Sequence, residues 1–325
     1  MRIASKVVCL VALVAVAGSA WAGEWEMRKE AQLIVPASAG GGSDIAGRVI
    51  ADIVMKNKLA DKNFVVINKP GGASAVGYNY MLTRVGDPYT LLSLHSGAMV
   101  TSYVGGWDKG FDEILDIIAI MAYDDVTLCV MADGPWKDIK SFMEYTKANP
   151  GKIRFGSDQR LNSSQLLFEL MKIHAGCDMN YVQYNSSGDV AGALLGGHVD
   201  VGILNPGECI GQVQAGNFIP IVTFAPNRLS GKIFEDAPTF AEIGLPELTY
   251  REFRGLAGAK NMPIEAIRYY EKVAKAITET EQWKKNYIEA NSLTPGWMGY
   301  DEAMPWAIAD ISASREIFKQ VEAQK

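Results

Sequence analysis

The chain has 325 residues, and its 31 lysines and arginines face 37 aspartates and glutamates, which gives a formal charge of −6 near neutral pH. This acidic balance lacks the basic surface that nucleic-acid binding needs, so we expect no nucleic-acid partner. The length is enough for two α/β domains, each with its own core, and for a cleft between them.

The first 22 residues have the pattern of a cleavable export signal. Two basic residues precede an apolar stretch over residues 7–17, and Ala20-Trp21-Ala22 fits a signal-peptidase site. The stretch is too short to span a membrane, and Cys9 lies ahead of its centre, which argues against a lipid anchor. We therefore expect a soluble exported protein of 303 residues that starts at Gly23, with 29 basic and 37 acidic residues.

A strand, a glycine loop and a helix start are predicted between Leu33 and Arg48. Residues 33–35 predict a buried strand, Pro36 ends it, and a helix is predicted over 44–54. The loop glycines allow a ligand to approach the backbone, and a helix N-terminus carries about half a positive charge. The loop favours a carboxylate or phosphate oxygen, with an ordinary strand-to-helix turn as the alternative. The candidate contacts are Ser38, Ala39, Gly41, Gly42, Ser43 and Asp44, of which Ser43 or Asp44 would cap the helix.

This loop lacks the pattern of a nucleotide site. A P-loop ends in Gly-Lys followed by Ser or Thr, whereas here Gly42 is followed by Ser43 and Asp44. The Asp44 carboxylate would also repel a polyphosphate, so nucleotide binding is disfavoured.

Further candidates follow the next two predicted strands, residues 64–67 and 90–94. Residues 69–74 have the composition of a second strand-to-helix loop, with a plain Pro-Gly turn as the alternative. The end of the other strand is where open α/β sheets bind ligands. Its histidine is either a hydrogen-bond donor to the ligand or a structural histidine. The candidates are Gly72 and Ser74 in the loop, and Ser93 and His95 at the strand end.

The rest of the chain continues the alternation of strand-like and helix-like runs that is typical of α/β layering. The strand-like runs are residues 117–122, 126–131, 153–155, 199–204 and 219–224, and the helix-like runs are 136–148, 164–174, 189–195, 263–278 and 304–321. No long linker separates two lobes, so the chain is expected to cross between them in ordinary strands, over 121–131 and 219–225. This predicts a first lobe of residues 23–125 and 225–325 with an inserted second lobe of 126–224, joined by a hinge.

Cysteines and histidines give little support to a metal site. Three histidines are widely separated and there is no CxxC, so we expect neither a metal nor a cofactor. After export, Cys129, Cys177 and Cys209 permit at most one disulfide, and the sequence does not select a pair.

Several segments together are similar to the periplasmic solute-binding proteins of tripartite tricarboxylate transporters, the Bug or TctC family. They are LIVPASAGGGSDIAGR from Leu33, NKPGGASAVGYNYM from Asn68, GDPYTLLSLHSG from Gly86, IRFGSDQRLNSSQLLFEL from Ile153, VQYNSSGDVAGALLGGHVDVGI from Val182, DAPTFAEIGLP from Asp236 and RGLAGAKNMP from Arg254. Their order and spacing cover nearly all of the chain after the signal.

The resemblance implies a type II periplasmic binding fold, in which two α/β lobes close on a small carboxylated solute. It also implies a periplasmic monomer that delivers this solute to a membrane permease. The family places one carboxylate between two loops, which correspond here to residues 38–44 and 157–165. In the second loop, Ser163 or Ser164 would cap the helix and leave backbone donors near Ser157.

The second loop departs from the family pattern because it is more polar. Asp158 and Arg160 could pair with an amine and a distal carboxylate of the ligand, or with each other at the surface. A basic residue that the family often carries after Tyr184 is absent. The remaining candidates on this side are Asn162 in the loop, Tyr184, and Asn205 after a predicted strand, for which a plain turn is the alternative.

Two other functions compete with a transport receptor. A serine hydrolase would use Ser43 or Ser157 with His95, but neither serine lies in a GxSxG motif, so we do not expect an enzyme. A ligand-binding subunit that feeds a chemoreceptor or sensor kinase would present the same closed lobes, so the sequence leaves this partner open.

Overall fold

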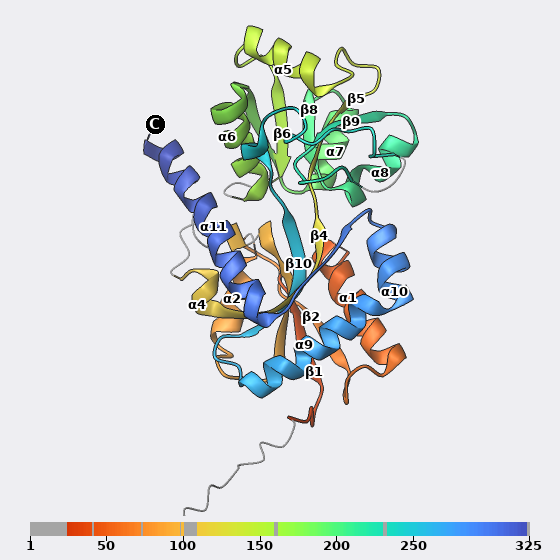
Figure 1. The fold of residues 1–325 in the computed structure, drawn as a ribbon, viewed down its shortest axis with the longest axis vertical. Helices are drawn as coiled ribbons and strands as arrows, with labels where there is room; N and C mark the ends of the chain where they lie inside the picture. The colour runs from red at the N-terminus through yellow and green to blue at the C-terminus, as the bar shows by residue number, and fades with distance from the viewer. Residues whose placement is uncertain are drawn as a thin grey trace, which may run out of the picture.

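The computed structural model describes residues 25–40, 42–72, 74–97, 99–100, 109–158, 162–229 and 233–323. The predicted export signal and the candidates Gly41 and Arg160 lie outside these ranges. Within them, strands and helices alternate and gather into two lobes, one above the other in Figure 1. None of the described helices has the length and apolar character to span a bilayer.

The first lobe is built on a sheet with the strand order β11-β4-β10-β3-β1-β2. β1 pairs in parallel with β2 and β3, whereas β10 is antiparallel to its neighbours β3 and β4. The elements of this lobe are β1 (Ala31–Val35), α1 (Gly42–Asn57), β2 (Phe64–Asn68), α2 (Ala75–Leu82), β3 (Thr90–His95), α4 (Phe111–Ile114), β4 (Leu115–Asp124), β10 (Glu252–Ala259), α9 (Ile264–Glu279), α10 (Glu281–Trp283), the π-helix η2 (Lys284–Glu289), β11 (Thr294–Met298) and α11 (Tyr300–Ala323).

Two apolar clusters lie on opposite faces of this sheet. Leu33 of β1 faces the cluster that holds α1 and α9, whereas the next residue, Ile34, faces the cluster that holds α2 and α11. Successive side chains of a strand point to opposite faces, and both faces are covered here, so β1 is apolar throughout. This explains why residues 33–35 lack the polar alternation of a half-exposed strand.

The second lobe is built on a sheet with the strand order β7-β6-β8-β5-β9. The parallel strands β7, β6 and β8 meet an antiparallel edge of β5 and β9. The elements of this lobe are β5 (Thr127–Met131), α5 (Ile139–Ala148), β6 (Arg154–Asp158), α6 (Ser163–Ala175), β7 (Asn180–Tyr184), α7 (Ser187–Leu195), β8 (Val201–Leu204), α8 (Pro206–Gln214), β9 (Phe218–Thr223) and the short 3₁₀ helix η1 (Pro246–Leu248). Cys129, Cys177 and Cys209 are buried thiols in this lobe.

The chain passes between the lobes twice. The first passage follows β4, which ends at Asp124, and leads into β5, which begins at Thr127. The second passage differs from the predicted crossing over 219–225. β9 pairs with β5 inside the second sheet, and the chain then stays against that sheet until β10 carries it back.

Contacts beyond β9 hold residues 225–250 against the second lobe. Thr223 forms a β-bridge with Thr239, and the Tyr250 amide donates to the carbonyl of Phe224 over 2.8 Å. Leu229 and Phe234 belong to the apolar cluster of α7 and β9. These two apolar residues after β9 are therefore packed in the second lobe rather than the first.

A buried ion pair joins the two passages. Arg251 donates from Nε and Nη2 to the two carboxylate oxygens of Asp125, both over 2.7 Å, and its guanidinium lies 3.7 Å from the ring centre of Tyr123. The Thr294 hydroxyl donates to the same carboxylate over 2.6 Å. Asp125 is 1% exposed, so the pair fixes both passages at one point.

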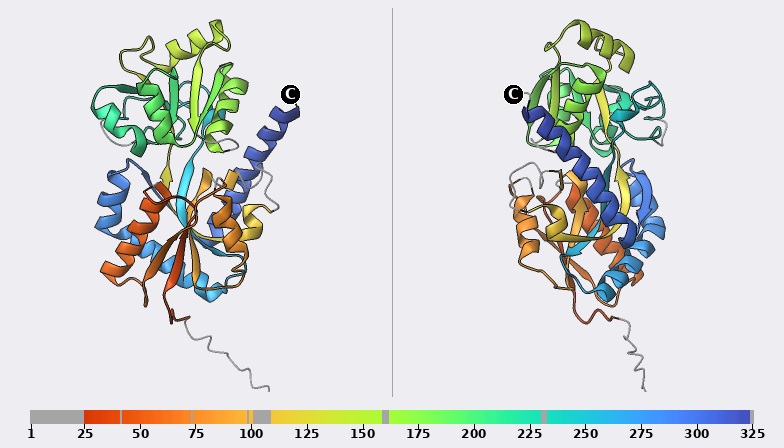
Figure 2. Two further views of the ribbon diagram at one scale, coloured as in Figure 1. Left: turned by 180° about the vertical axis from the view of Figure 1, so that it is seen from behind. Right: turned by 60° about the vertical axis from the view of Figure 1, so that its left-hand side comes forward.

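α11 runs from the first lobe to the second, as Figure 2 also shows from two further directions. It packs against β4 in one lobe and against α6 in the other. The helix contains Pro305 in its second turn, beyond the first four N–H groups, so it forgoes one intrahelical hydrogen bond there.

Candidate functional site

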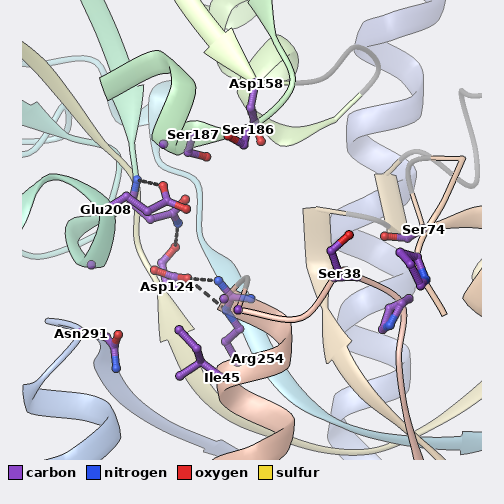
Figure 3. Close-up of a pocket in the computed structure, with 18 of the residues that line it drawn as sticks. Ser38, Ile45, Ser74, Asp124, Asp158, Ser186, Ser187, Glu208, Arg254 and Asn291 are labelled. Atoms are coloured by element: carbon purple, nitrogen blue, oxygen red, sulfur yellow. Dashed lines mark hydrogen bonds and ion pairs between the residues drawn. The ribbon is translucent and has the colours of Figure 1, made fainter. Parts of the chain in front are cut away.

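A cavity of about 670 Å³ lies between the lobes, and both lobes contribute to its lining (Figure 3). A smaller cavity of about 170 Å³ shares much of this lining, including Gly42, Ser74 and Asn205. The first lobe supplies the loops before α1 and α2, the second lobe supplies the starts of α7 and α8, and the ends of β4 and β10 lie between them.

The loop before α1 is held in place by Asp44. Its carboxylate accepts the Gly40 amide over 2.9 Å, Nε of Arg48 over 2.8 Å and Nδ2 of Asn68 over 2.8 Å. The hydrogen bond from Arg48 is the largest cause that lowers the pKa of Asp44, to about 2. The carboxylate therefore turns into the protein, and Ser38, Gly40 and Gly42 face the cavity instead.

The loop before α2 also reaches the cavity. Ser74, in a left-handed conformation with φ of 76°, lines both cavities, and Gly71 with φ of 121° lines the larger one. Gly72 lines neither. At Gly71 this φ favours a residue without a side chain.

An arginine and an aspartate lie between the two walls. Arg254 of β10 donates to Oδ2 of Asp124 from Nε over 3.0 Å, and from Nη2 as well. Its Nη1 lies 3.5 Å from Oγ of Ser43. A Cβ on Gly42 would lie 3.2 Å from Arg254 Nη2, so the guanidinium sits directly beside the start of α1.

The protein itself places a carboxylate at the start of α6. Glu252, the first residue of β10, accepts a short hydrogen bond from the Ser163 hydroxyl and lies 3.0 Å from Nε2 of His95. Nδ2 of Asn205 donates to it over 3.2 Å. Burial alone would raise the pKa of Glu252, but His95 and Ser163 lower it to about 2.

This arrangement changes the interpretation of the second predicted loop. Ser157 is completely buried, and its hydroxyl donates to the carbonyl of Asp158 and accepts from the hydroxyl of Tyr181, both over 3.0 Å. Asn162 caps α6 through its side-chain oxygen and donates to Oδ1 of Asp158 over 2.9 Å. The Ser163 hydroxyl at the start of α6 is thus engaged by a carboxylate of the protein itself, that of Glu252.

The second lobe turns the starts of α7 and α8 toward the cavity. Ser186 caps α7 by accepting the Asp189 amide over 3.2 Å, and Ser187 and Gly188 line the cavity beside it. At the start of α8, the Asn205 amide donates to Oε2 of Glu208 over 3.3 Å. These two helix starts line the larger cavity, whereas the start of α6 lines only the smaller one.

Two carboxyl groups line this second-lobe wall. Burial raises the pKa of Asp158. The pKa of Glu208 rises to about 8, because the lobes enclose its carboxyl group and because Asp124 and Asp158 lie nearby. Glu208 is nevertheless exposed toward the cavity. Among the described residues, no group of histidine, cysteine, aspartate and glutamate has the arrangement of a metal site.

Comparison with known proteins identifies the family. Residues 46–321 match the family described as "TctC: Tripartite tricarboxylate transporter family receptor". The chain belongs to this family. It is 25% identical over 292 residues to the "UPF0065 protein in gbd 5'region" of Cupriavidus necator, across 89% of this chain and 86% of that protein. BugT of Bordetella pertussis is 28% identical over 219 residues, which are 66% of each chain.

Solved structures confirm the two-lobed α/β fold of the receptor family. A TctC solute-binding protein from Polaromonas superimposes with a TM-score of 0.76 at 22% identity, over 90% of this chain and 99% of that one. MatC from Rhodopseudomonas palustris, solved with bound malate, superimposes with a TM-score of 0.74 at 17% identity, over 89% of this chain and 99% of that one. Rpa4515 from the same organism, solved with adipate, superimposes with a TM-score of 0.75 at 21% identity, over 90% of this chain and 97% of that one.

The structure brings together many, but not all, of the residues predicted for the receptor site. Lining one or both cavities are Ser38, Gly42, Ser43, Ser74, His95, Asp158, Asn162, Ser163, Ser164 and Asn205. Outside both are Ala39, Asp44, Gly72, Ser93 and Ser157. Ser93 donates to the carbonyl of Ser43 over 3.2 Å and so supports the first loop. Tyr184 lines a different cavity of about 510 Å³ beside α7.

Sequence reasoning missed the charged residues of the site. Asp124 lies just beyond the predicted run 117–122, and Arg254 and Glu208 lie on a strand and a helix that were not predicted. The signals were present, because each is a charge beside an apolar or glycine-rich run. A buried charge needs a partner, so the arginine and aspartate could have been paired in advance.

Proposed function

We propose that this receptor captures a small carboxylate-containing solute between its lobes and delivers it to the membrane permease of a tripartite tricarboxylate transporter. The observation that carries the proposal is the cavity of about 670 Å³, where the start of α1 and the Arg254 guanidinium face the starts of α7 and α8. Family membership supports the transport role, and the bound malate and adipate of two structural neighbours support the ligand class.

A carboxylate suits the first-lobe wall for physical reasons. The first N–H groups of a helix lack partners within the helix, and the helix dipole adds to their attraction for an anion. Asp44 turns away from the cavity to Arg48 and Asn68, so it does not occupy this position. The hydroxyls of Ser38 and Ser74 add donors to the same wall.

Closure of the lobes turns binding into a signal. A solute that contacts both walls binds more tightly when the lobes are together, and it therefore shifts the population toward the closed state. The permease then recognises that shape. We propose a lobe division at residues 125/126 and near residue 251, because residues 225–250 pack on the second sheet.

The finer parts of the proposal concern place and chemistry. We propose that residues 1–22 direct export to the periplasm, where the receptor acts as a monomer without enzymatic activity. His95 is engaged by Glu252, and Ser43 lies against Arg254, so these side chains do not form a serine–histidine pair.

Thermal unfolding of the solute-free protein tests the proposal. The panel contains mono-, di- and tricarboxylates, amino acids, aromatic acids and neutral sugars. At a hundredfold excess over Kd, a ligand adds about 2.7 kcal/mol to the free energy of unfolding. This corresponds to about 5 to 10 °C in the unfolding midpoint for lobes of this size. Shifts confined to acids support the proposal, whereas shifts with sugars alone, or none with any acid, overturn it.

A further inference from the structure

The two walls of the cavity differ in charge. Figure 3 shows Ser38 and Ser74 to the right of the space, Asp158 above it and Glu208 to its left, with Asp124 and Arg254 below Glu208. The first-lobe side offers hydroxyls, the start of α1 and a guanidinium. The second-lobe side presents two carboxyl groups to the same space.

Among the described residues that line the larger cavity, Arg254 is the only lysine or arginine. Asp124 already balances much of its positive charge. Two of its nitrogens bind the same oxygen of Asp124, and both side chains are buried. Three donors of the guanidinium remain, since Arg carries five N–H groups. They point to the start of α1, where Nη1 and Nη2 lie beside Ser43 and Gly42. The site therefore provides favourable contacts for one carboxylate on the first-lobe side.

Neutral donors alone contact the second-lobe carboxyl groups among the described residues. Asn162 donates to Asp158 over 2.9 Å, and the Asn205 amide donates to Glu208 over 3.3 Å. Such donors orient a carboxyl group without neutralising it once it is ionised. A second ligand carboxylate on this side would meet like charge wherever these groups are ionised, whereas an ammonium group would favour their ionised form and make charge-assisted hydrogen bonds to it.

We infer that the solute carries a positively charged nitrogen as well as a carboxylate, with the carboxylate toward Gly42 and Arg254 and the nitrogen toward Asp158 and Glu208. This inference rests on the proposed function and narrows the ligand class to amino acids and related zwitterions. The ligand would span the space between the lobes, and its two charges would draw the two walls together.

Isothermal titration calorimetry with matched acids tests the charge of the second group. Each dicarboxylate is paired with the amino acid in which a CH₂NH₃⁺ group replaces one carboxylate: succinate with 4-aminobutanoate, glutarate with 5-aminopentanoate, and adipate with 6-aminohexanoate. The α-amino acids aspartate, glutamate, lysine and arginine extend the series. We expect the zwitterion with the highest affinity to bind at least tenfold more tightly than succinate, glutarate or adipate. A dicarboxylate that binds as tightly or more tightly overturns the inference.

Variants assign the preference to the named residues. Glu208→Gln and Asp158→Asn keep the shape and remove a carboxyl group that could ionise beside an ammonium, so each is expected to weaken binding of the tightest zwitterion about tenfold and to leave binding of dicarboxylates unchanged or slightly tighter. Glu279→Gln, which removes an exposed carboxylate of α9 outside both cavities, is the matched control. Equal losses for zwitterions and dicarboxylates would also contradict the inference.

The two proposals fail in different ways. Binding of dicarboxylates with no gain for zwitterions removes the charge inference and leaves the receptor function standing. Absence of binding by every carboxylate in the series removes the receptor function itself. Circular dichroism of each variant shows that a lost titration reflects the site rather than loss of the fold.

Discussion

Arg254 controls the charge balance of the cavity because it touches both the start of α1 and Asp124. The guanidinium presents its remaining donors where a ligand carboxylate is expected, and Asp124 prevents it from adding a full positive charge. A ligand carboxylate would therefore be held by directed hydrogen bonds and the helix dipole together. The same balance makes the site sensitive to any new charge beside it.

Gly42→Asp is expected to abolish carboxylate binding and to leave the fold intact. The backbone at Gly42 does not need a positive φ, and the new carboxylate would reach Arg254 and repel the ligand. Gly211→Asp is the control, because a side chain there meets open space on α8. Calorimetric titration with the acid that the wild-type protein binds most tightly measures the affinity of each variant. Unchanged affinity in Gly42→Asp would exclude the first loop from the site.

Glu208→Gln is expected to stabilise the solute-free protein at high pH. A folded-state pKa of about 8 means that the folded protein holds this proton more tightly than the unfolded chain does, so ionisation costs stability as pH rises from about 4.5 to 8. The facing groups are Asp124 on β4, Asp158 on β6, Ser187 on α7 and Arg254 on β10.

After allowance for screening by the water of the cavity, the gain at pH 8.5 should be about 1 kcal/mol, which is about 2 to 4 °C in the midpoint. At pH 4 the two proteins should unfold together, because both carry a neutral side chain at this position. Thermal scans at both pH values measure the difference, and an equal shift at both would show that Glu208 is not the titrating group.

The role of some single residues can be predicted from the neighbouring sequence, whereas the role of others depends on contacts with distant parts of the chain. The glycine loop before α1 was predicted because its pattern is local, and Ser38 and Gly42 do line the cavity. Asp44 was assigned to the ligand, but Arg48 lies one helical turn away and takes its carboxylate. That pairing also involves Asn68 on another strand, and a contact across the fold is invisible to local pattern.

At the scale of elements, β10 was the main omission. Its sequence EFRGLAGA contains two glycines and few β-branched residues, so propensity does not indicate a strand. Gly255 explains the composition, because a Cβ there would lie 2.1 Å from the Ala119 carbonyl oxygen on β4. Close approach of two buried backbones selected the glycine, and tertiary packing overrode the local preference.

Helix starts show a similar limit. The sequence predicted that the start of α6 binds the ligand, and the hydroxyls and cap are as expected there. Glu252, which is 89 residues away from Ser163, accepts a hydrogen bond from that hydroxyl, and the start of α6 lines only the smaller cavity. Nothing in either segment alone specifies this contact. The start of α7 faces the cavity through Ser186 and Ser187, although Tyr184 just before it was the predicted contact.

Glu252→Ala is expected to destabilise the protein by about 3 kcal/mol near pH 7, since it leaves His95, Ser163 and Asn205 without their shared partner. The pKa of Glu252 is lowered to about 2, so its contribution is full above about pH 4.5 and is lost as pH falls through 2. Urea unfolding from pH 7 to pH 2 should show the difference from wild type shrinking. A constant difference would mean that lost packing, not charge, causes the effect.

At the scale of the whole molecule, the sequence predicted two lobes and their order along the chain, because α/β alternation and the family segments extend over nearly all of it. The second passage was misplaced, since an apolar strand at 219–225 looks the same whether it crosses or stays. Only the later packing of Thr239 and Phe234 on the second lobe decides between these possibilities.

Arg251→Ala is expected to cost about 3 to 5 kcal/mol, because Asp125 would remain buried without its guanidinium where both passages meet. Asp125→Asn with Arg251→Ala should recover part of this loss, and the double-mutant cycle measures the coupling between the two side chains. Additive losses in the cycle would show that the pair does not act as a unit in joining the passages.

α11 connects the two lobes along one side of the molecule. The helix touches β4 in one lobe and α6 in the other, and none of its described residues lines either cavity. Across the cavity, Gly207 of α8 approaches Asn291 after η2, so a Cβ on the glycine would lie 3.4 Å from the Asn291 carbonyl oxygen. The two lobes are thus joined along α11 on one side of the cavity, and α8 meets the segment after η2 on another. We expect the lobes to separate where Gly207 approaches Asn291, so that a solute would pass there and a permease that unloads the receptor would have to act on that side.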